Sequence, residues 1–178
     1  MHKISRRNIF IYSVFAVVSV ILAYYLWQYG KYVTPAKIGG VAPNIKAVTV
    51  TGQKFQLKSL KGETVLLNFF TPWCPPCLQE TPDLITFSKQ YGHQIHVVLI
   101  DRGDDNVLVR NYVKKYHLPS EMTVLFDQTD FWSPPYGVTG QPETFLISSN
   151  GRIINHIIGP LTEAQMVQYA KEAGMKTH

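Results

Sequence analysis

The stretch TVLLNFFTPWCPPC, residues 64–77, joins an apolar run to two cysteines that lie three positions apart. Its first half, Thr64–Phe70, is nearly continuously apolar, as a strand buried on both faces would be. Two prolines follow Cys74, and proline suits the first turn of a helix, where backbone N–H groups have no intrahelical partner. Apolar side chains then recur at helical spacing over Pro75–Tyr91. The stretch therefore predicts a strand-to-helix junction with Cys74 at the start of the helix.

The chain has only two cysteines, too few for a disulfide-stapled scaffold or for an all-cysteine zinc site. A C-x-x-C pair between a buried strand and a helix indicates redox chemistry. Unpaired N–H groups and the positive end of the helix dipole stabilise a thiolate at that point. Residues three apart share a helix face, within disulfide reach. We expect Cys74 to be the exposed nucleophile and Cys77 the shielded, resolving thiol.

Beyond this stretch, strand-like and helix-like segments alternate from about Asn44 onward. We expect strands at 45–50, 54–57, 64–70, 94–100, 122–126, 143–148 and 152–158, and helices at 75–91, at 107–116 with Asn106 as its cap, and from Thr162 onward. Strands separated by helices pair in parallel, whereas the turn signals Thr51-Gly52 and Asn150-Gly151 favour antiparallel hairpins. The order predicts an α/β fold: a mixed sheet with helices on both faces and a hairpin at its N-terminal end.

Residues Ile9–Trp27 form a run of 19 residues without a charge. As a helix, the run would be roughly 28 Å long, which matches a hydrocarbon core of roughly 30 Å. Lys3, Arg6 and Arg7 precede it, so the positive-inside rule places the N-terminus in the cytoplasm and the rest of the chain outside. A cleaved signal peptide is the alternative, but the residues after the run offer no small-x-small cleavage site. We therefore expect an uncleaved, single-pass membrane anchor.

These features predict three parts: a basic flank with the transmembrane anchor (1–29), a linker containing glycine and proline (30–43), and a globular domain (44–178). Three of the 17 Lys and Arg residues precede the apolar run, and all 12 acidic residues follow it. The net charge of +5 is thus partly a topology signal. It gives little reason to expect a nucleic-acid partner.

The segment Trp73-Cys74-Pro75-Pro76-Cys77 resembles the active site of the thioredoxin superfamily. Pro82 matches the kink proline of that family's active-site helix, and Pro142 resembles its cis-proline, which opens a strand beside the disulfide. The resemblance covers about residues 41–175. It implies a thioredoxin-like fold.

Two differences from thioredoxin itself indicate which branch of the superfamily the chain resembles. Cys77 and Pro142 are 65 positions apart, more than in thioredoxin, and the excess matches the helix at 107–116 and the strand after it. Asn68 stands where thioredoxin has a buried aspartate. Together with the anchor, Glu80 and the string Gly-Gln-Pro-Glu-Thr-Phe-Leu-Ile, these features resemble the TlpA/ResA/CcmG-type branch.

The resemblance implies roles for individual residues. An acidic residue at position 80 tunes the acidity of the cysteines and moves protons, although an ordinary solvated helix glutamate would occupy the same position. A cis bond before Pro142 would expose the backbone of Gln141 for pairing with an extended substrate. Glu143 would shape the partner groove or tune the cysteines, or else be a plain strand-edge charge. The expected catalytic residues are Cys74, Cys77 and Glu80, and the expected substrate contacts are Trp73, Pro75, Pro76, Gln141, Pro142 and Glu143.

The resemblance also implies a function. Members of that branch are extracytoplasmic reductants of low potential, and their substrates include apocytochrome c before haem attachment. We therefore expect protein disulfides or dithiols as substrates, a membrane protein as electron donor, and a Cys74–Cys77 disulfide in place of any cofactor or metal. Two alternatives remain: a disulfide-forming oxidant, and a copper-binding module that uses two thiolates.

Overall fold

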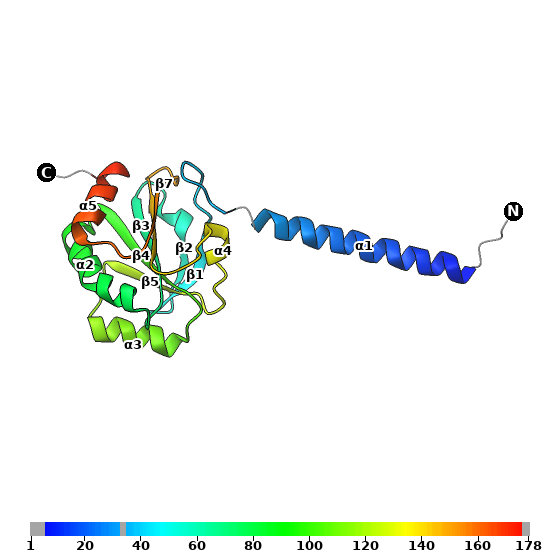
Figure 1. Ribbon diagram of the computed structural model, residues 1–178, viewed down its shortest axis with the longest axis horizontal. Helices are drawn as coiled ribbons and strands as arrows, with labels where there is room; N and C mark the ends of the chain where they lie inside the picture. The colour runs from blue at the N-terminus through cyan, green and yellow to red at the C-terminus, as the bar shows by residue number, and fades with distance from the viewer. Residues whose placement is uncertain (1–5, 33–34, 176–178) are drawn as a thin grey trace. The chain divides into compact units, whose positions relative to one another are not determined.

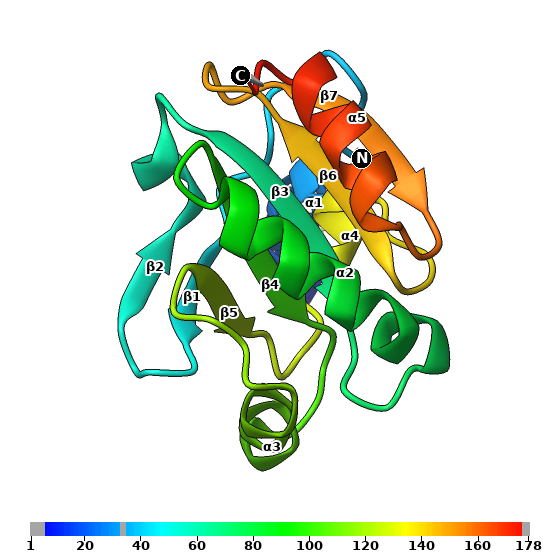
Figure 2. The ribbon, with the colours of Figure 1, turned by 90° about the vertical axis from the view of Figure 1, so that its left-hand side faces the viewer.

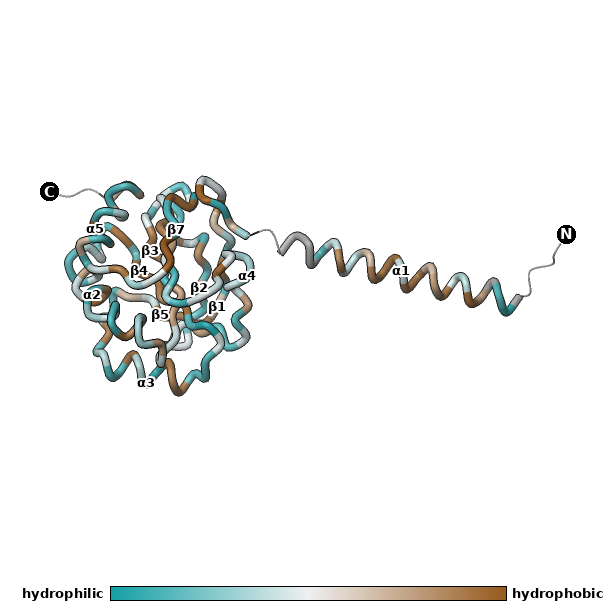
Figure 3. The backbone as a smooth tube through the Cα atoms, viewed as in Figure 1, coloured by the Kyte–Doolittle hydropathy of each residue, from teal (hydrophilic) through white to brown (hydrophobic). Residues whose placement is uncertain are grey.

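The computed structural model describes residues 6–32 and 35–175, and the chain divides into two units, 1–34 and 35–178. The first unit holds a single helix, α1 (Arg6–Tyr32). Its segment Phe10–Gln28 is long and apolar enough to cross a membrane and is not buried against protein. Figure 3 shows apolar residues along its length. The helix fits a single-pass anchor; of its expected basic flank, Lys3 lies outside the described residues.

The second unit is built on one mixed sheet of seven strands in the order β2-β1-β5-β4-β3-β6-β7 (Figure 1). The strands are β1 (Lys46–Thr49), β2 (Lys54–Gln56), β3 (Thr64–Phe70), β4 (Ile95–Asp101), β5 (Met122–Phe126), β6 (Glu143–Ile147) and β7 (Ile153–Ile158). The β3–β4 and β4–β5 pairs are parallel, whereas β1–β2, β1–β5, β3–β6 and β6–β7 are antiparallel. All seven residues of β3 are buried. The mixed sheet and its N-terminal hairpin are confirmed.

Helices cover both faces of the sheet. They are α2 (Pro75–Tyr91), α3 (Asn106–Tyr116), α4 (Ser133–Tyr136), α5 (Glu163–Glu172) and a 3-10 turn at Leu57–Leu60. Side chains from α2, α3 and α5 pack in one cluster on the face of Leu66, while α4 and the 3-10 turn contribute to the cluster on the face of Leu67. Figure 2 shows α2 and α5 in front of the sheet. The expected α3–β5 insertion is present, and α4 and the 3-10 turn are additions.

The described part of the expected linker is built into the domain. Ala36 N–H donates to Pro135 O, Gly39 N–H to Ile153 O, and Ala42 N–H to Gly151 O, each within 2.9 Å. The compact unit accordingly begins at Pro35 rather than at residue 44. These backbone hydrogen bonds hold an irregular segment on the surface of the domain. A composition rich in glycine and proline does not distinguish such a segment from a free tether.

The N-terminus of α3 departs from expectation by one residue. Asp105, not Asn106, is its cap, and its side chain accepts a bond from Val107 N–H at 2.7 Å. Cap residues keep an extended backbone while their oxygen satisfies an early helical N–H. In contrast, Thr162 caps α5 as expected, with a reciprocal bond between its backbone N–H and the Gln165 side chain.

Mutation can distinguish whether Asp105 or Asn106 is the cap of α3. We expect Asp105→Ala to lower the free energy of unfolding by about 1 kcal/mol, because Val107 N–H loses its acceptor. Asn106→Ala is the matched control and should cost clearly less. Urea unfolding of residues 35–178 measures both. A larger loss for Asn106→Ala would show that the cap is assigned to the wrong residue.

Candidate active site

Cys74 and Cys77 lie where β3 passes into α2. Cys74 is the N-cap of α2, and its sulfur accepts a bond from Cys77 N–H at 3.4 Å. Pro75 and Pro76 occupy the first two helical positions, where no N–H is needed, and Pro82 lies inside the helix as expected. Both cysteines are free thiols. The strand-to-helix junction predicted from the sequence is therefore confirmed.

The thiols are less accessible than expected. Cys77 is 2% exposed, and Cys74, expected to be exposed, is only 4% exposed. The Cys74 thiol is directed inward and donates to the carbonyl oxygen of Gln141 at 3.6 Å. The expectation of an exposed Cys74 is thus wrong for this conformation, because the segment before Pro142 covers the thiol.

The surface around Cys74 is formed by three other expected contact residues. Trp73 is 58% exposed, and Pro75 and Pro76 are exposed as well. The Trp73 indole N–H donates to a carboxylate oxygen of Asp104 at 2.9 Å, which ties the loop before Cys74 to the segment before α3. The position of these side chains is compatible with partner contact, which stays a prediction.

Burial raises the pKa of the Cys77 thiol well above its ordinary value. Its bond with Cys74 and the negative charges of Cys74 and Glu80 act in the same direction, and a backbone bond involving Thr71 opposes them. The Cys77 thiol therefore holds its proton in the reduced protein, as a resolving cysteine does until the mixed disulfide forms.

Glu80 is a buried carboxyl group, 1% exposed, and not a solvated helix residue. One oxygen accepts from the Asn68 side-chain amide at 3.0 Å, and the other accepts from Leu161 N–H at 2.8 Å. Asn68 also donates to the Thr144 hydroxyl at 2.9 Å. Burial raises the pKa of Glu80 to about 7, outweighing these two hydrogen bonds to its carboxylate, which lower it. A proton acceptor that titrates near neutral pH thus lies next to Cys77.

This carboxyl predicts a pH-dependent stability. The folded state holds the Glu80 proton up to about pH 7, whereas the ordinary pKa is 4.5, so the free energy of unfolding falls as pH rises between these values. In Glu80→Gln, the decrease in the free energy of unfolding with rising pH should be smaller than in the wild type by about 3 kcal/mol. The amide is tolerable because Asn68 can turn its own amide and present its oxygen, which has no partner in the structure.

Urea unfolding of reduced residues 35–178 at pH 5 and pH 8 tests this expectation. Glu121→Gln, which changes an exposed carboxylate just before β5, is the matched control and should keep the wild-type difference. If Glu80→Gln also keeps it, then Glu80 is not the group that titrates.

The peptide bond between Gln141 and Pro142 is cis, as expected. Pro142 is buried, and the segment before it is held by Glu143. One oxygen of Glu143 accepts from Thr139 N–H at 2.8 Å and from Gly140 N–H at 2.7 Å. Substrate contact by Gln141 and Pro142 stays a prediction.

Glu143 is fully buried, and its environment favours the charged form. Burial alone would raise the pKa of Glu143, but the N–H groups of Thr139 and Gly140 and the His156 side chain together lower it. His156 contacts the second carboxylate oxygen at 2.6 Å and stacks on Phe145 with ring centroids 4.1 Å apart. A strand-edge charge is therefore excluded, and the carboxylate supports the cis-proline segment instead of facing solvent.

Several residues of the site were not singled out from the sequence: Arg102, Asp104, Asp130, Thr144, His156 and Leu161. The strand pairing could have indicated two of these residues, Arg102 and His156. Phe70 pairs with Asp101 at the carboxyl ends of parallel β3 and β4, so the residues after β4 lie beside the cysteine loop. In the β6–β7 hairpin, Phe145 pairs with His156, which places His156 diagonal to Glu143.

Asp101, the last residue of β4, accepts from Asp104 N–H at 2.8 Å and so holds the turn that follows the strand. Burial raises the pKa of Asp101 to about 8, and the charge of Asp104 adds to the shift. Asp127, the first residue after β5, likewise accepts from Phe131 and Trp132 N–H. Both aspartates keep loops near the site in place.

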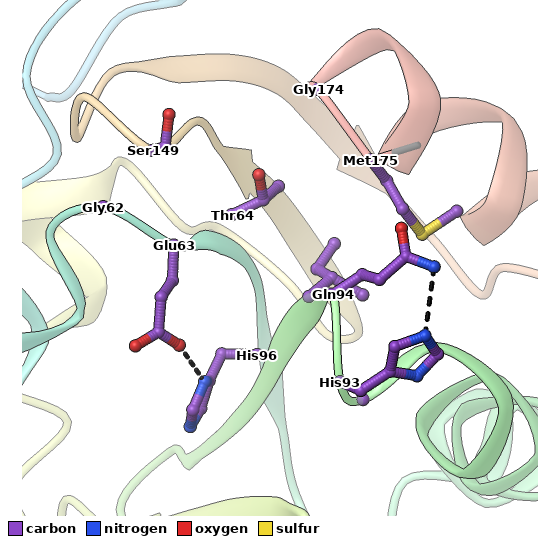
Figure 4. A pocket seen from close by; sticks show the side chains of 11 residues that line it. Gly62, Glu63, Thr64, His93, Gln94, His96, Ser149, Gly174 and Met175 are labelled. Carbon is purple, nitrogen blue, oxygen red and sulfur yellow. Dashed lines mark hydrogen bonds and ion pairs between the residues drawn. The ribbon is translucent and has the colours of Figure 1, made fainter. Parts of the chain in front are cut away.

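A separate hollow of about 430 Å³ lies at the opposite end of the sheet, around the first residues of β3 and β4 (Figure 4). Glu63 and His96 form an ion pair there, at 2.6 Å. Neither cysteine lines it. Among residues 6–32 and 35–175, no three His, Cys, Asp or Glu side chains are grouped so as to hold a metal ion.

A thioredoxin-like sheet, a C-x-x-C pair at the start of a helix and a cis-proline beside it define a thiol–disulfide oxidoreductase. Comparison with known proteins agrees. The model of the Redoxin family matches residues 37–173, and the chain belongs to that family.

Relatives of known sequence and structure are similar over most of the domain. The thiol-disulfide oxidoreductase ResA of Bacillus thuringiensis is 34% identical over 137 residues, which cover 76% of this chain and 78% of that protein. ResA of Bacillus subtilis is 31% identical, covering 74% and 73%. A crystal structure of a putative thiol:disulfide interchange protein DsbE from Chlorobium tepidum superposes with a TM-score of 0.70 at 28% identity, covering 78% of this chain and 99% of that one.

Proposed function

We propose that this protein is a disulfide reductant that acts outside the cytoplasm on envelope proteins, tethered to the membrane by α1. The observation that carries the proposal is the buried carboxyl of Glu80 beside the buried Cys77 thiol. A thioredoxin-like pair becomes an oxidant when its reduced form is stabilised. Here burial and a neighbouring carboxylate oppose thiolate formation at Cys77, so the reduced form lacks the thiolate stabilisation that makes such a pair oxidising, and this favours electron donation.

The reaction is two successive exchanges. The Cys74 thiolate attacks one sulfur of a partner disulfide, and a mixed disulfide forms as the partner's other sulfur leaves and takes up a proton. Glu80 accepts the Cys77 proton, and the Cys77 thiolate then attacks the Cys74 sulfur. The partner leaves as a dithiol with two electrons, and the Cys74–Cys77 disulfide remains. A membrane protein that passes electrons outward would restore the dithiol.

The substrate and the location are proposed from the resemblance and from the charge pattern. The resemblance to the TlpA/ResA/CcmG branch favours apocytochrome c as a substrate. The basic residues before α1 favour a cytoplasmic N-terminus with the domain outside. A shared membrane raises the effective concentration of the enzyme, its electron donor and a membrane-bound substrate.

The reduction potential tests the direction. We expect the Cys74–Cys77 couple of the full chain in detergent to lie near or below that of thioredoxin, about −270 mV. Glu80→Gln should raise it by about 30 mV, a tenfold change in the equilibrium constant, while Glu121→Gln should not. A value near about −120 mV would make the protein an oxidant that introduces disulfides.

Trapping tests the order of the two cysteines. Cys77→Ser should accumulate mixed disulfides with partner proteins, because Cys74 attacks but nothing resolves the product. Cys74→Ser is the matched control and should accumulate none. Non-reducing electrophoresis followed by mass spectrometry detects the adducts. The reverse pattern would assign the attack to Cys77, and cytochrome c among the trapped proteins would support the proposed substrate.

Protease accessibility tests the topology. Proteinase K added to intact spheroplasts should digest residues 35–178 and leave a protected N-terminal fragment. Detergent lysis is the control that exposes the whole chain. Protection of the domain in intact spheroplasts would place it in the cytoplasm and exclude an extracytoplasmic substrate.

The copper-binding alternative is weaker. Two thiols can bind Cu(I), but among the described residues no three His, Cys, Asp or Glu side chains are grouped so as to hold a metal ion. Stoichiometric copper retention that depends on both cysteines would revive it.

A further inference from the structure

Arg102 lies beside the site although no step of the exchange uses it. It is the first residue after β4, and its N–H donates to Phe70 O at 3.1 Å, where β3 ends. Its side chain is 14% exposed. Burying a guanidinium carries a desolvation cost, which is offset only where its donors are matched by acceptors.

The guanidinium donates hydrogen bonds to four groups: the Asp130 carboxylate, the Ser133 hydroxyl, the Gly140 carbonyl and the Gln141 side-chain amide. On one side it bonds Asp130 Oδ2 at 3.0 Å and the Ser133 hydroxyl at 2.9 Å, at the start of α4. On the other side, Nη1 donates to Gly140 O and to the Gln141 side-chain oxygen, both at 2.7 Å. Arg102 thus joins the loop before α4 to the segment that precedes Pro142.

The Gly140–Gln141 segment is consequently held from two directions. Gly140 N–H is bonded by Glu143, and Gly140 O is bonded by Arg102. The next carbonyl along the chain, that of Gln141, accepts the Cys74 thiol. Loss of the Glu143 bond or of the Arg102 bond would leave the orientation of these peptide groups beside Cys74 less fixed.

We propose that Arg102 is a positioning residue for exchange at Cys74: it orients the Gly140–Gln141 segment so that a protein partner meets the thiol in the reactive geometry. The inference rests on thiol–disulfide exchange at Cys74 and not on its direction or its substrate. A protein partner that pairs with this segment requires the segment to be correctly oriented, whereas a small disulfide requires only access to the thiol.

Lysine cannot replace arginine in this role. The planar guanidinium fork reaches acceptors on both sides, whereas an ammonium is a single point at the end of a flexible chain. Arg102→Lys keeps the charge that neutralises Asp130 and so separates positioning from charge. Arg102→Met removes both.

The experiment measures second-order rates of disulfide reduction by the full chain in detergent, with insulin as the protein disulfide and 5,5′-dithiobis(2-nitrobenzoic acid) as the small one. We expect Arg102→Lys and Arg102→Met to slow insulin reduction about tenfold, because a displaced segment misplaces the partner. The rate with the small disulfide should change less than twofold. Arg152→Met, which removes an arginine from the turn at the opposite end of β6, is the matched control and should change neither rate.

A double-mutant cycle that combines Arg102→Lys with Gln141→Ala supplies an independent measurement. The single variant Gln141→Ala keeps Arg102. If Arg102 acts through this segment, the loss in Arg102→Lys/Gln141→Ala should be smaller than the product of the two single losses. Equal slowing of both disulfides, additive losses, or Arg102 variants that match Arg152→Met would overturn the inference. If the wild type reduces neither disulfide, it is the proposed function that fails.

Discussion

The structure depends on one buried carboxyl group. Glu80 belongs to the active-site helix, yet its two oxygens are bonded to Asn68 of the central strand and to the backbone just before α5. A carboxyl can stay in a core only if it is hydrogen bonded or protonated, and this one is bonded and titrates near neutral pH. The same group therefore ties α2, β3 and the α5 loop together, and its charge adds to the rise in the pKa of the neighbouring Cys77 thiol that burial mainly causes. Burying this carboxyl lowers the free energy of unfolding as the pH rises, and it places a proton acceptor beside Cys77.

The segment before Pro142 shows how charges outside the exchange itself shape the site. Glu143 holds its N–H groups and Arg102 holds a carbonyl, so peptide dipoles are satisfied by an anion on one side and a cation on the other. Each ion also has a side-chain partner: His156 Nε2 lies 2.6 Å from the Glu143 carboxylate, and Asp130 pairs with Arg102. The segment that covers Cys74 is thereby held from both sides, and Trp73 and the two prolines lie exposed around the thiol.

The local features could be predicted from the sequence because short-range rules govern them: the strand-to-helix junction, the hairpin turns, the Thr162 cap and the redox motif. The α3–β5 insertion followed from spacing. The burial of Glu80 could not be predicted in this way, since a polar helix residue faces solvent unless another segment closes over it, here the residues before α5. Arg102 and His156 were missed for a related reason: their partners lie 38 and 13 positions away, respectively, and only strand register brings them together. Composition likewise could not show that residues 35–43 pack on the domain.

The cysteine content has a practical consequence for finding partners. Both cysteines of the chain lie in the exchange site, and neither forms a structural disulfide. Folding needs no oxidative step, and no structural disulfide can be scrambled by the chemistry the protein performs. Any covalent thiol adduct recovered from cells is therefore a captured catalytic intermediate, so the protein carries a built-in affinity label for its own substrates.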